Sequence, residues 1–509
     1  MDFLNDPTSN DAASAAPRPA MPGACGAATG RGGAPPRGRG GAPARGAPHD
    51  PGAFPPGPSP TCGSGAPGTP AASGPGAPQA RTSWLQLAVV SAASFVAWTA
   101  FGAILPYLPL FLKEQAHSSM FMIGLIASMY YVGTLLFSSP LGWLSDTVGR
   151  KPVLVSGAAL SALALLLFTA TTDPYWFIVF RLLEGIGTAG VGPAGQAFIA
   201  DITPERDRSK AYGILTTAQF GGLIIGPALA PPLYHLAGGG QAGFYAIFYF
   251  GAILGFVTTL VLLAFVREPA ATRARRTARE ARGQKRGERP PYRAVLTRPV
   301  LAFVVVAFMS HYAMGGWEVV WSLWLEHLGA SMTYIGLTWV AFSVPMLLSF
   351  AGGMLADRYS RFALMFTGYA ISAVAWILYG STTNLTLFLI VNVIEGLAIA
   401  FSYPAKQAFL IQVSPRRWLG TVTGIETTSM QLAGLLGTLT APLLYDLISG
   451  YVLALGGLLA LTGLAVAAPV LHREWHRLSA SSERLSQKEL EALAAARPDA
   501  AATPPFGID

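Results

Sequence analysis

The stretch Gly142-Trp-Leu-Ser-Asp146-Thr-Val-Gly149-Arg150-Lys151 has a second copy at Gly353-Met-Leu-Ala-Asp357-Arg358-Tyr-Ser-Arg361. In both copies an aspartate follows the glycine by four residues and an arginine follows it by eight. A glycine lets membrane helices approach closely. The aspartate can pair with the arginine or lie at a helix N-terminus, where negative charge is favoured. An ordinary charged loop would explain these charges, but neither their spacing nor the second copy.

The offset of 211 residues continues along the chain. Glu184-Gly185 corresponds to Glu395-Gly396, and Pro193 corresponds to Pro404. Matches without a gap extend from Gly142 to Tyr234 in the first half. We expect that a six-helix unit has been duplicated in the same orientation. Parallel repeats of this kind are typical of transporters that rock about a central site.

Apolar blocks near the ~20 residues needed to cross a bilayer fill the chain from Trp84 to Leu471. Charged residues make up 12% of the sequence, against about 25% in soluble proteins, which argues against a cytosolic enzyme. Backbone groups in lipid must bond internally, so the blocks must be helices. We predict an all-α membrane protein with twelve transmembrane helices in two six-helix bundles. The blocks are 84–112, 121–143, 152–170, 174–198, 209–237, 242–266, 299–325, 333–356, 362–380, 384–411, 418–446 and 449–471.

The net charge of +8 is concentrated in one segment. Residues 267–298 hold eleven basic and three acidic residues, a difference of +8. This charge indicates topology and not nucleic-acid binding. The other basic loop residues fall almost entirely in even-numbered connections, which places those connections and both termini in the cytoplasm. Contact of the segment with anionic lipid is an alternative to a solvated linker.

Five segments follow from this pattern. Residues 1–83 contain 17 Pro and 16 Gly and are predicted to be a disordered cytoplasmic tail. The N-terminal bundle covers 84–266, the basic cytoplasmic linker 267–298, the C-terminal bundle 299–471, and a cytoplasmic tail 472–509. Both cysteines lie in the first tail. We find no phosphate loop, zinc cluster or hydrolase elbow, so we predict no metal, no cofactor and no enzymatic activity.

The stretch at 142–151 resembles the signature cytoplasmic loop of the major facilitator superfamily. The resemblance implies a loop that switches between conformations, in which breaking a contact of the aspartate releases one state. The residues concerned are Gly142, Asp146, Gly149, Arg150, Lys151, Gly353, Asp357 and Arg361.

Two helix motifs refine this resemblance. Gly213, Gly222 and Gly226-Pro227 resemble the helix 5 motif that marks antiporters of the superfamily, although Ala230 stands where a further glycine is expected. Ordinary glycine-mediated packing is the alternative. Arg181-Leu-Leu-Glu184 resembles the helix 4 motif whose buried arginine is linked to proton coupling. A static Arg181–Glu184 ion pair is the alternative.

Four further charges fall inside apolar blocks, where an ionisable residue is a functional hypothesis by default. Glu395, the repeat partner of Glu184, is a candidate proton carrier, or else a glutamate hydrogen-bonded to a neighbouring helix. Lys406 and Glu426 lie at equal depth on successive helices, so we predict an ion pair. Its role is either structural or in coupling. Glu318 lies beside Trp317 on helix 7.

In this superfamily helices 1, 4, 7 and 10 line the cavity, which makes Trp98, Tyr107 and Trp317 candidate substrate contacts. We assign Trp321 and Trp324 to an aromatic belt at the outer membrane surface. Helix 1 has no acid before Glu114, which argues against recognition of cationic drugs.

The resemblance to twelve-helix drug:proton antiporters implies export of small amphipathic or hydrophobic compounds in exchange for protons. Uptake or facilitated exchange of a sugar, organic acid or lysolipid by the same fold is the alternative, and a membrane-embedded enzyme is a third. We expect a monomer in the plasma membrane, here a bacterial inner membrane, whose partners are a small-molecule substrate, protons and the lipid bilayer, with no nucleic acid.

Overall fold

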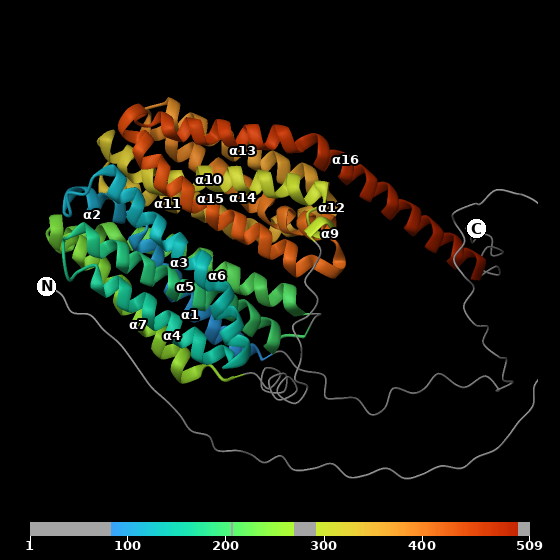
Figure 1. Ribbon diagram of the computed structural model, residues 1–509, viewed down its shortest axis with the longest axis horizontal. Coiled ribbons are helices and arrows are strands. Elements are labelled where there is room, and N and C mark those ends of the chain that lie inside the picture. The colour runs from blue at the N-terminus through green and yellow to red at the C-terminus, as the bar shows by residue number, and fades with distance from the viewer. Residues whose placement is uncertain (1–82, 205–206, 269–291, 497–509) are drawn as a thin grey trace, which may run out of the picture. The chain divides into compact units, whose positions relative to one another are not determined.

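The computed structural model describes residues 83–204, 207–268 and 292–496, and every regular element within these ranges is helical (Figure 1). The first half contains α1 (Trp84–Ile104), α2 (Leu108–Glu114), α3 (Met120–Thr147), α4 (Arg150–Leu167), α5 (Pro174–Ile202), α6 (Arg208–Leu236) and α7 (Gly240–Phe265). The second half contains α9 (Tyr292–Val295), α10 (Arg298–His327), α11 (Met332–Ser343), η2 (Val344–Leu348), α12 (Ser349–Arg358), α13 (Arg361–Ser381), α14 (Leu385–Val413), η3 (Arg416–Trp418), α15 (Leu419–Ile448) and α16 (Tyr451–Ala496).

Eleven helical stretches in the described part of the chain are long and apolar enough to cross a membrane, with α1 and α2 counted as one. The block predicted at 333–356 differs from the other eleven. It folds as α11, the 3-10 turn η2 and α12, and its longest apolar helical piece is Met332–Leu348. Pro345 lies in η2. A proline has no backbone N–H to donate and clashes with the preceding turn of an α-helix, which accounts for the interruption.

Corresponding helices of the two halves begin at a constant distance in sequence. The helices α4, α5, α6 and α7 begin at residues 150, 174, 208 and 240, and α13, α14, α15 and α16 begin at 361, 385, 419 and 451, each 211 residues later. The offset between the two loop sequences is therefore also the offset between helix starts.

Each half packs mainly within itself (Figure 1). In the first half α1 packs on α6, and α5 packs on α3 and α4. In the second half α10 packs on α15 and α16, and α13 packs on α14 and α16. Between the halves, α3 packs on α15 and α6 packs on α11. These two pairs of helices join the halves side by side.

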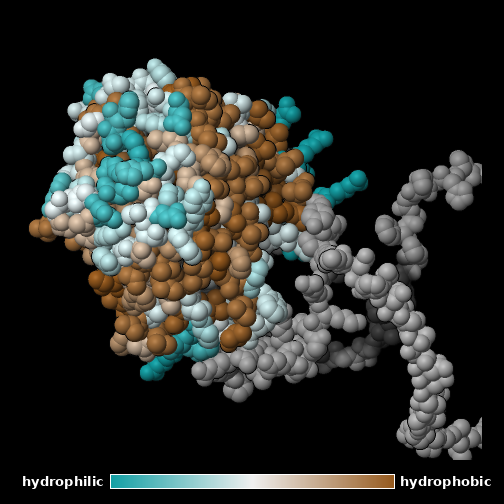
Figure 2. Space-filling model, turned by 60° about the vertical axis from the view of Figure 1, so that its left-hand side comes forward, coloured by the Kyte–Doolittle hydropathy of each residue, from teal (hydrophilic) through white to brown (hydrophobic). Residues whose placement is uncertain are grey.

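Large apolar side chains are exposed along the outer helices, and hydrophobic residues cover much of the face seen in Figure 2. On α7 alone the exposed residues include Ile253, Leu260, Leu263 and Phe265. Soluble monomers rarely expose apolar patches of this extent. With the eleven spanning helices, this surface identifies a multi-pass membrane protein.

The last helix is longer than a membrane crossing requires. Helix α16 has 46 residues, which at 1.5 Å per residue is about 70 Å. It continues beyond Leu471 into the segment predicted as the C-terminal tail, where His472, Arg473 and Glu474 follow one another.

Candidate functional site

A buried ion pair lies in the first half of α5. Arg181 Nη1 is 2.9 Å from Glu184 Oε2, and both side chains are almost fully buried. Residues three apart on a helix share a face, so the helix itself brings these groups together. The ion pair considered from the sequence is therefore present, and a role in proton coupling stays a prediction.

Helix α3 extends this pair toward the other half of the molecule. The guanidinium carbon of Arg181 lies 4.9 Å from the centre of the Tyr130 ring. The neighbouring Tyr131 donates a hydrogen bond of 2.8 Å to Glu318 Oε2, on α10. The rings of Tyr130 and Tyr131 lie 5.5 Å apart, so the two tyrosines connect Arg181 with Glu318. We call Arg181, Glu184, Glu318, Tyr130 and Tyr131 the central cluster.

The central cluster combines two carboxylates with one guanidinium and spans both halves. Sequence reasoning identified all three charges but did not connect Glu318 with the α5 pair, and it missed both tyrosines. Neighbouring tyrosines on an apolar helix are an ordinary core pattern. Their role becomes visible only when α3 and α10 are placed next to each other.

Glu395 is separate from these contacts. Its carboxylate accepts a hydrogen bond of 2.9 Å from the Tyr379 hydroxyl on α13, and only 2% of the residue is exposed. Asn392, which stands where the first repeat has Arg181, donates its side-chain amide to the Phe388 carbonyl. The structure thus places Glu395 in hydrogen-bonding contact with a neighbouring helix, and its role as a proton carrier stays a prediction.

The predicted Lys406–Glu426 ion pair is present. Lys406 Nζ on α14 lies 2.9 Å from Glu426 Oε1 on α15, and both side chains are almost fully buried.

The histidine of α10 is held within its own helix. His311 forms a hydrogen bond through Nδ1 to the Ala307 carbonyl, one turn earlier.

Arg150 is the centre of the predicted switch loop. Its guanidinium contacts Asp146 at 2.6 Å, Asp201 at 3.3 Å and the Ser145 hydroxyl at 2.7 Å. Asp146 is the partner predicted from the spacing. Asp201, at the end of α5, and Ser145 were not predicted.

The start of α4 also binds a third carboxylate, that of Glu268. Both oxygens of Glu268 accept backbone N–H groups, from Arg150 at 2.7 Å and Lys151 at 2.9 Å. The preceding Gly149 has φ +125°, and a Cβ there would lie 3.1 Å from the Glu268 carboxyl. Only glycine readily adopts this positive φ and also leaves room for the Glu268 carboxyl group. Glu268 was not predicted, because sequence reasoning assigned it to the linker.

The second copy of the loop is less fully described. Gly353 lies in α12 with open space beside it, and Arg361 begins α13. Asp357 belongs to α12, but its side chain lies outside the described part of the chain.

The helix 5 motif packs α6 on α1. A Cβ at Gly222 would lie 2.8 Å from the Thr99 backbone nitrogen, and one at Gly226 would lie 2.5 Å from that of Ala103. These two glycines therefore allow the helices to approach closely. Gly213 differs, because nothing lies within 4 Å of its Cβ position.

The backbone carbonyl of Pro227 takes part in a contact between the two halves. Its carbonyl would normally accept the N–H of residue 231, but that residue is Pro231, which has none. The Tyr107 hydroxyl lies 3.4 Å from this carbonyl and 3.3 Å from that of Met332, at the start of α11. Tyr107, a candidate substrate contact, is 1% exposed and joins three helices. Nearby, Lys113 pairs with Glu326 at 2.5 Å, which also connects the halves.

The assignment of Trp321 and Trp324 to an aromatic belt is wrong. Trp321 is fully buried and donates to Thr338, and Trp324 is nearly buried and donates to the Tyr379 carbonyl. Helix α10 is covered by α15 and α16, and spacing along one helix does not show which face its neighbours cover.

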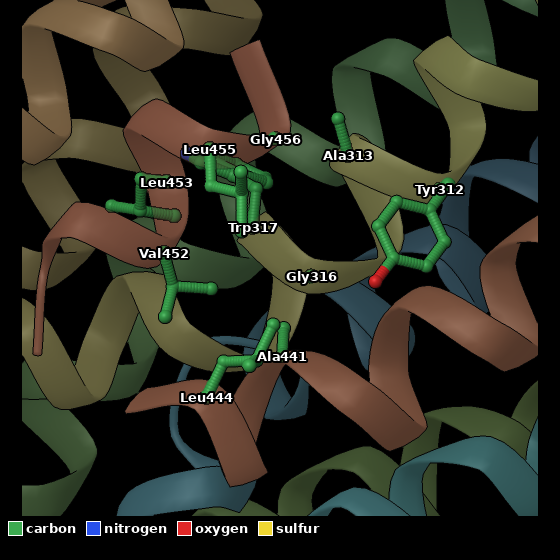
Figure 3. Close-up of a pocket in the computed structure, with 10 residues that line it drawn as sticks. All are labelled: Tyr312, Ala313, Gly316, Trp317, Ala441, Leu444, Val452, Leu453, Leu455 and Gly456. Atoms are coloured by element: carbon green, nitrogen blue, oxygen red, sulfur yellow. The ribbon is translucent and has the colours of Figure 1, made fainter. Parts of the chain in front are cut away.

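The other two aromatic candidates differ in burial. Trp98 is half-buried and lies edge-on to Phe101 at 5.7 Å. Trp317 is buried against Trp339 and Phe342. It also lines a cavity of about 20 Å³ between α10, α15 and α16 (Figure 3). This volume suits about one water molecule, whereas ligand pockets usually measure ~300–1,000 Å³. This cavity is too small to be a substrate site. Within the described ranges, no group of three His, Cys, Asp or Glu side chains is placed to hold a metal.

Two family models match the chain. Residues 90–325 match the Major Facilitator Superfamily, and residues 233–453 match the MFS_1 like family. Multidrug resistance protein 2 of Bacillus subtilis (strain 168) is 26% identical over 382 residues, which cover 73% of this chain and 92% of the relative. Tetracycline resistance protein, class B, of Escherichia coli is 27% identical over 361 residues, which cover 68% and 84%.

A similar fold occurs among solved structures. A bacterial homologue of the human lysosomal transporter Spinster, in an inward-facing and occupied conformation, superimposes with a TM-score of 0.58 at 16% identity. The match covers 78% of this chain and 96% of the other.

Proposed function

Because this chain belongs to the Major Facilitator Superfamily, we propose that it is a secondary active transporter that exports small amphipathic or hydrophobic compounds in exchange for protons. It works by alternating access, in which the two halves rock about a central site. It acts as a monomer in a bacterial inner membrane, with both termini in the cytoplasm.

The proposed architecture has twelve crossings in two six-helix bundles. The eighth crossing consists of α11, η2 and α12 together. The bundles are 84–266 and 299–471, joined by the basic cytoplasmic linker 267–298. The constant offset of 211 residues between helix starts supports a duplicated unit.

The central cluster is the observation that carries the coupling proposal. Arg181 balances one of its two carboxylates, and the other leaves a net negative charge among membrane helices. An unbalanced charge there is costly. Uptake of one proton by Glu318 removes this charge, and release of the proton restores it. The energy of the cluster therefore depends on its protonation.

The position of the cluster connects protonation to movement. Tyr131 belongs to the first half and Glu318 to the second, and they share a hydrogen bond. A hydrogen bond to a charged group is worth about 1.5–3 kcal/mol and a neutral one about 0.5–1.5 kcal/mol. Protonation of Glu318 therefore weakens one contact between the halves, and lets them separate.

Two observations support export of drug-like compounds. The two relatives described above, from Bacillus subtilis and Escherichia coli, are named for multidrug resistance and tetracycline resistance. The close packing of Gly222 and Gly226 against α1 belongs to a motif that resembles that of antiporters. A second candidate, uptake or facilitated exchange of an organic acid, a sugar or a lysolipid, is favoured by the buried cation of Lys406, which suits an acidic substrate.

The test is dye accumulation in everted vesicles that contain the protein. An imposed proton gradient should drive accumulation, and a protonophore added halfway should reverse it. Vesicles with Glu474→Gln provide the control, because this glutamate lies in the part of α16 beyond Leu471 and outside the central cluster; they should keep gradient-driven accumulation. Dye movement that is the same with and without the gradient would refute proton coupling.

A further inference from the structure

The Lys406–Glu426 pair has no role in the coupling proposed above and no counterpart in the first half. Residues 211 positions earlier are Gly195 and Leu215. The pair is therefore an addition to the repeated scaffold. Apolar side chains of similar volume often replace a buried ion pair without loss of stability. Stability alone is thus a weak reason for these two charges.

The surroundings of Lys406 suit an amphipathic molecule. Its Nζ lies 5.5 Å from the centre of the Tyr403 ring and 3.7 Å from the Met430 sulfur. Tyr403 is 45% exposed, so part of this aromatic surface is uncovered. Methionine and aromatic side chains adapt to apolar ligands of varied shape. A cation, an aromatic face and a thioether therefore lie together at one place.

Next to Glu426, the surface of α15 is polar. Exposed residues on this part of the helix are Gly420, Thr423, Gly424, Thr427 and Thr428. Farther along the same helix the exposed residues Leu432, Leu443 and Leu447 are apolar, as lipid contact favours. The three threonines of this polar stripe offer hydroxyl groups to a polar ligand or to water. Glu426 adjoins this stripe on α15, in the part of the helix nearest its connection to α14.

We propose that Lys406 and Glu426 form a loading site for the anionic group of an amphipathic substrate. A carboxylate, sulfonate or phosphate on the substrate takes the place of Glu426 on the Lys406 ammonium. Tyr403 and Met430 bind the apolar body. This assignment rests on the proposed export function, since an exporter collects its substrate from the cytoplasmic side, and it names the substrate class as amphipathic anions and zwitterions.

The test compares two probes with one ring system. Rhodamine B carries a free carboxylate, and rhodamine B ethyl ester lacks it. Equilibrium binding of both is measured by fluorescence polarisation on the purified full-length protein, without a proton gradient. Lys406→Met should weaken binding of the acid about tenfold or more, as expected for loss of a charged hydrogen bond. The ester should change by less than about twofold.

Three further variants show whether a loss of binding comes from the missing charge or from misfolding. The double variant Lys406→Met with Glu426→Gln leaves no unpaired buried charge and should lose the acid as the single variant does. Glu426→Gln should bind the acid at least as tightly as the unaltered protein, because a competitor for Lys406 is gone. The matched control is Lys113→Met, which also removes the lysine of an ion pair and should leave both affinities unchanged.

The inference is overturned if the unaltered protein does not bind the acid. It is also overturned if the acid and ester lose affinity equally in the double variant. Selective loss of the acid supports it. Because no gradient is present, these outcomes do not depend on whether protons drive transport. Gradient-driven dye transport, with equal loss of acid and ester binding in the double variant, would refute only the loading site. Selective loss of acid binding, without gradient-driven transport, would refute only the proton coupling.

Discussion

Two glycines of the same helix motif should respond in opposite ways to the same substitution. Gly226→Ala adds a Cβ 2.5 Å from the Ala103 nitrogen and 2.8 Å from the Gly102 carbonyl carbon. These are backbone atoms of α1, which cannot rotate away. Overpacking of this kind costs about 1–3 kcal/mol. Gly213→Ala adds a Cβ with nothing within 4 Å and should stabilise the helix by about 0.5–1 kcal/mol.

The assay is thermal unfolding of the two variants in the same detergent, followed by tryptophan fluorescence. The apparent melting temperature should fall for Gly226→Ala and stay level or rise for Gly213→Ala. The chemical change is identical, so only the neighbourhood of each glycine distinguishes them. Equal shifts in the two variants would refute the close packing of α6 on α1. A transport measurement on Gly213→Ala then shows whether this glycine matters for anything besides packing.

Three further predictions concern other contacts. Gly149→Ala should slow transport and lower stability by about 1–3 kcal/mol, because φ is +125° there; normal stability would contradict this backbone conformation. Trp321→Phe should destabilise the protein by about 1–3 kcal/mol, because it removes a buried hydrogen bond to the Thr338 hydroxyl and leaves a cavity where the indole was; a neutral effect in unfolding would instead favour a lipid-facing ring. Reversing the charge of Lys113 or Glu326 alone should lower the stability of the protein, and reversing both charges should restore it. A double-mutant cycle should give a coupling energy of about 0.2–1 kcal/mol. If the double reversal does not restore stability, the ion pair is not formed.

Contacts within one helix and between successive helices were predictable. Arg181 and Glu184 are three residues apart, so any helix brings them together. Lys406 and Glu426 are at equal depth on consecutive helices, and burial of either charge alone would be costly. Helical blocks were predictable for the same reason, since lipid leaves the backbone no other choice. The break between α1 and α2 and the 3-10 turn at Pro345 interrupt this agreement.

Contacts between distant segments could not be predicted. The hydrogen bond from Tyr131 to Glu318 depends on how the two halves meet, and one sequence carries no signal for that. The burial of Trp321 depends on which helices cover α10. Glu268 follows the sixth predicted crossing, which folds as α7. Its contact with the start of α4 depends on the end of α7 and the start of α4 lying next to each other in the folded protein. Each of these features belongs to tertiary packing and not to local pattern.

The most direct test of the coupling proposal compares two modes of transport in one variant. In Glu318→Gln, exchange of labelled for unlabelled substrate without a proton gradient should continue, because that exchange needs no proton release. Accumulation driven by an imposed proton gradient should be lost. Glu395→Gln neutralises the other buried carboxylate considered as a proton carrier, outside the central cluster; it should keep both modes, which would assign the coupled proton to Glu318. Gradient-driven accumulation that survives in Glu318→Gln would contradict the account.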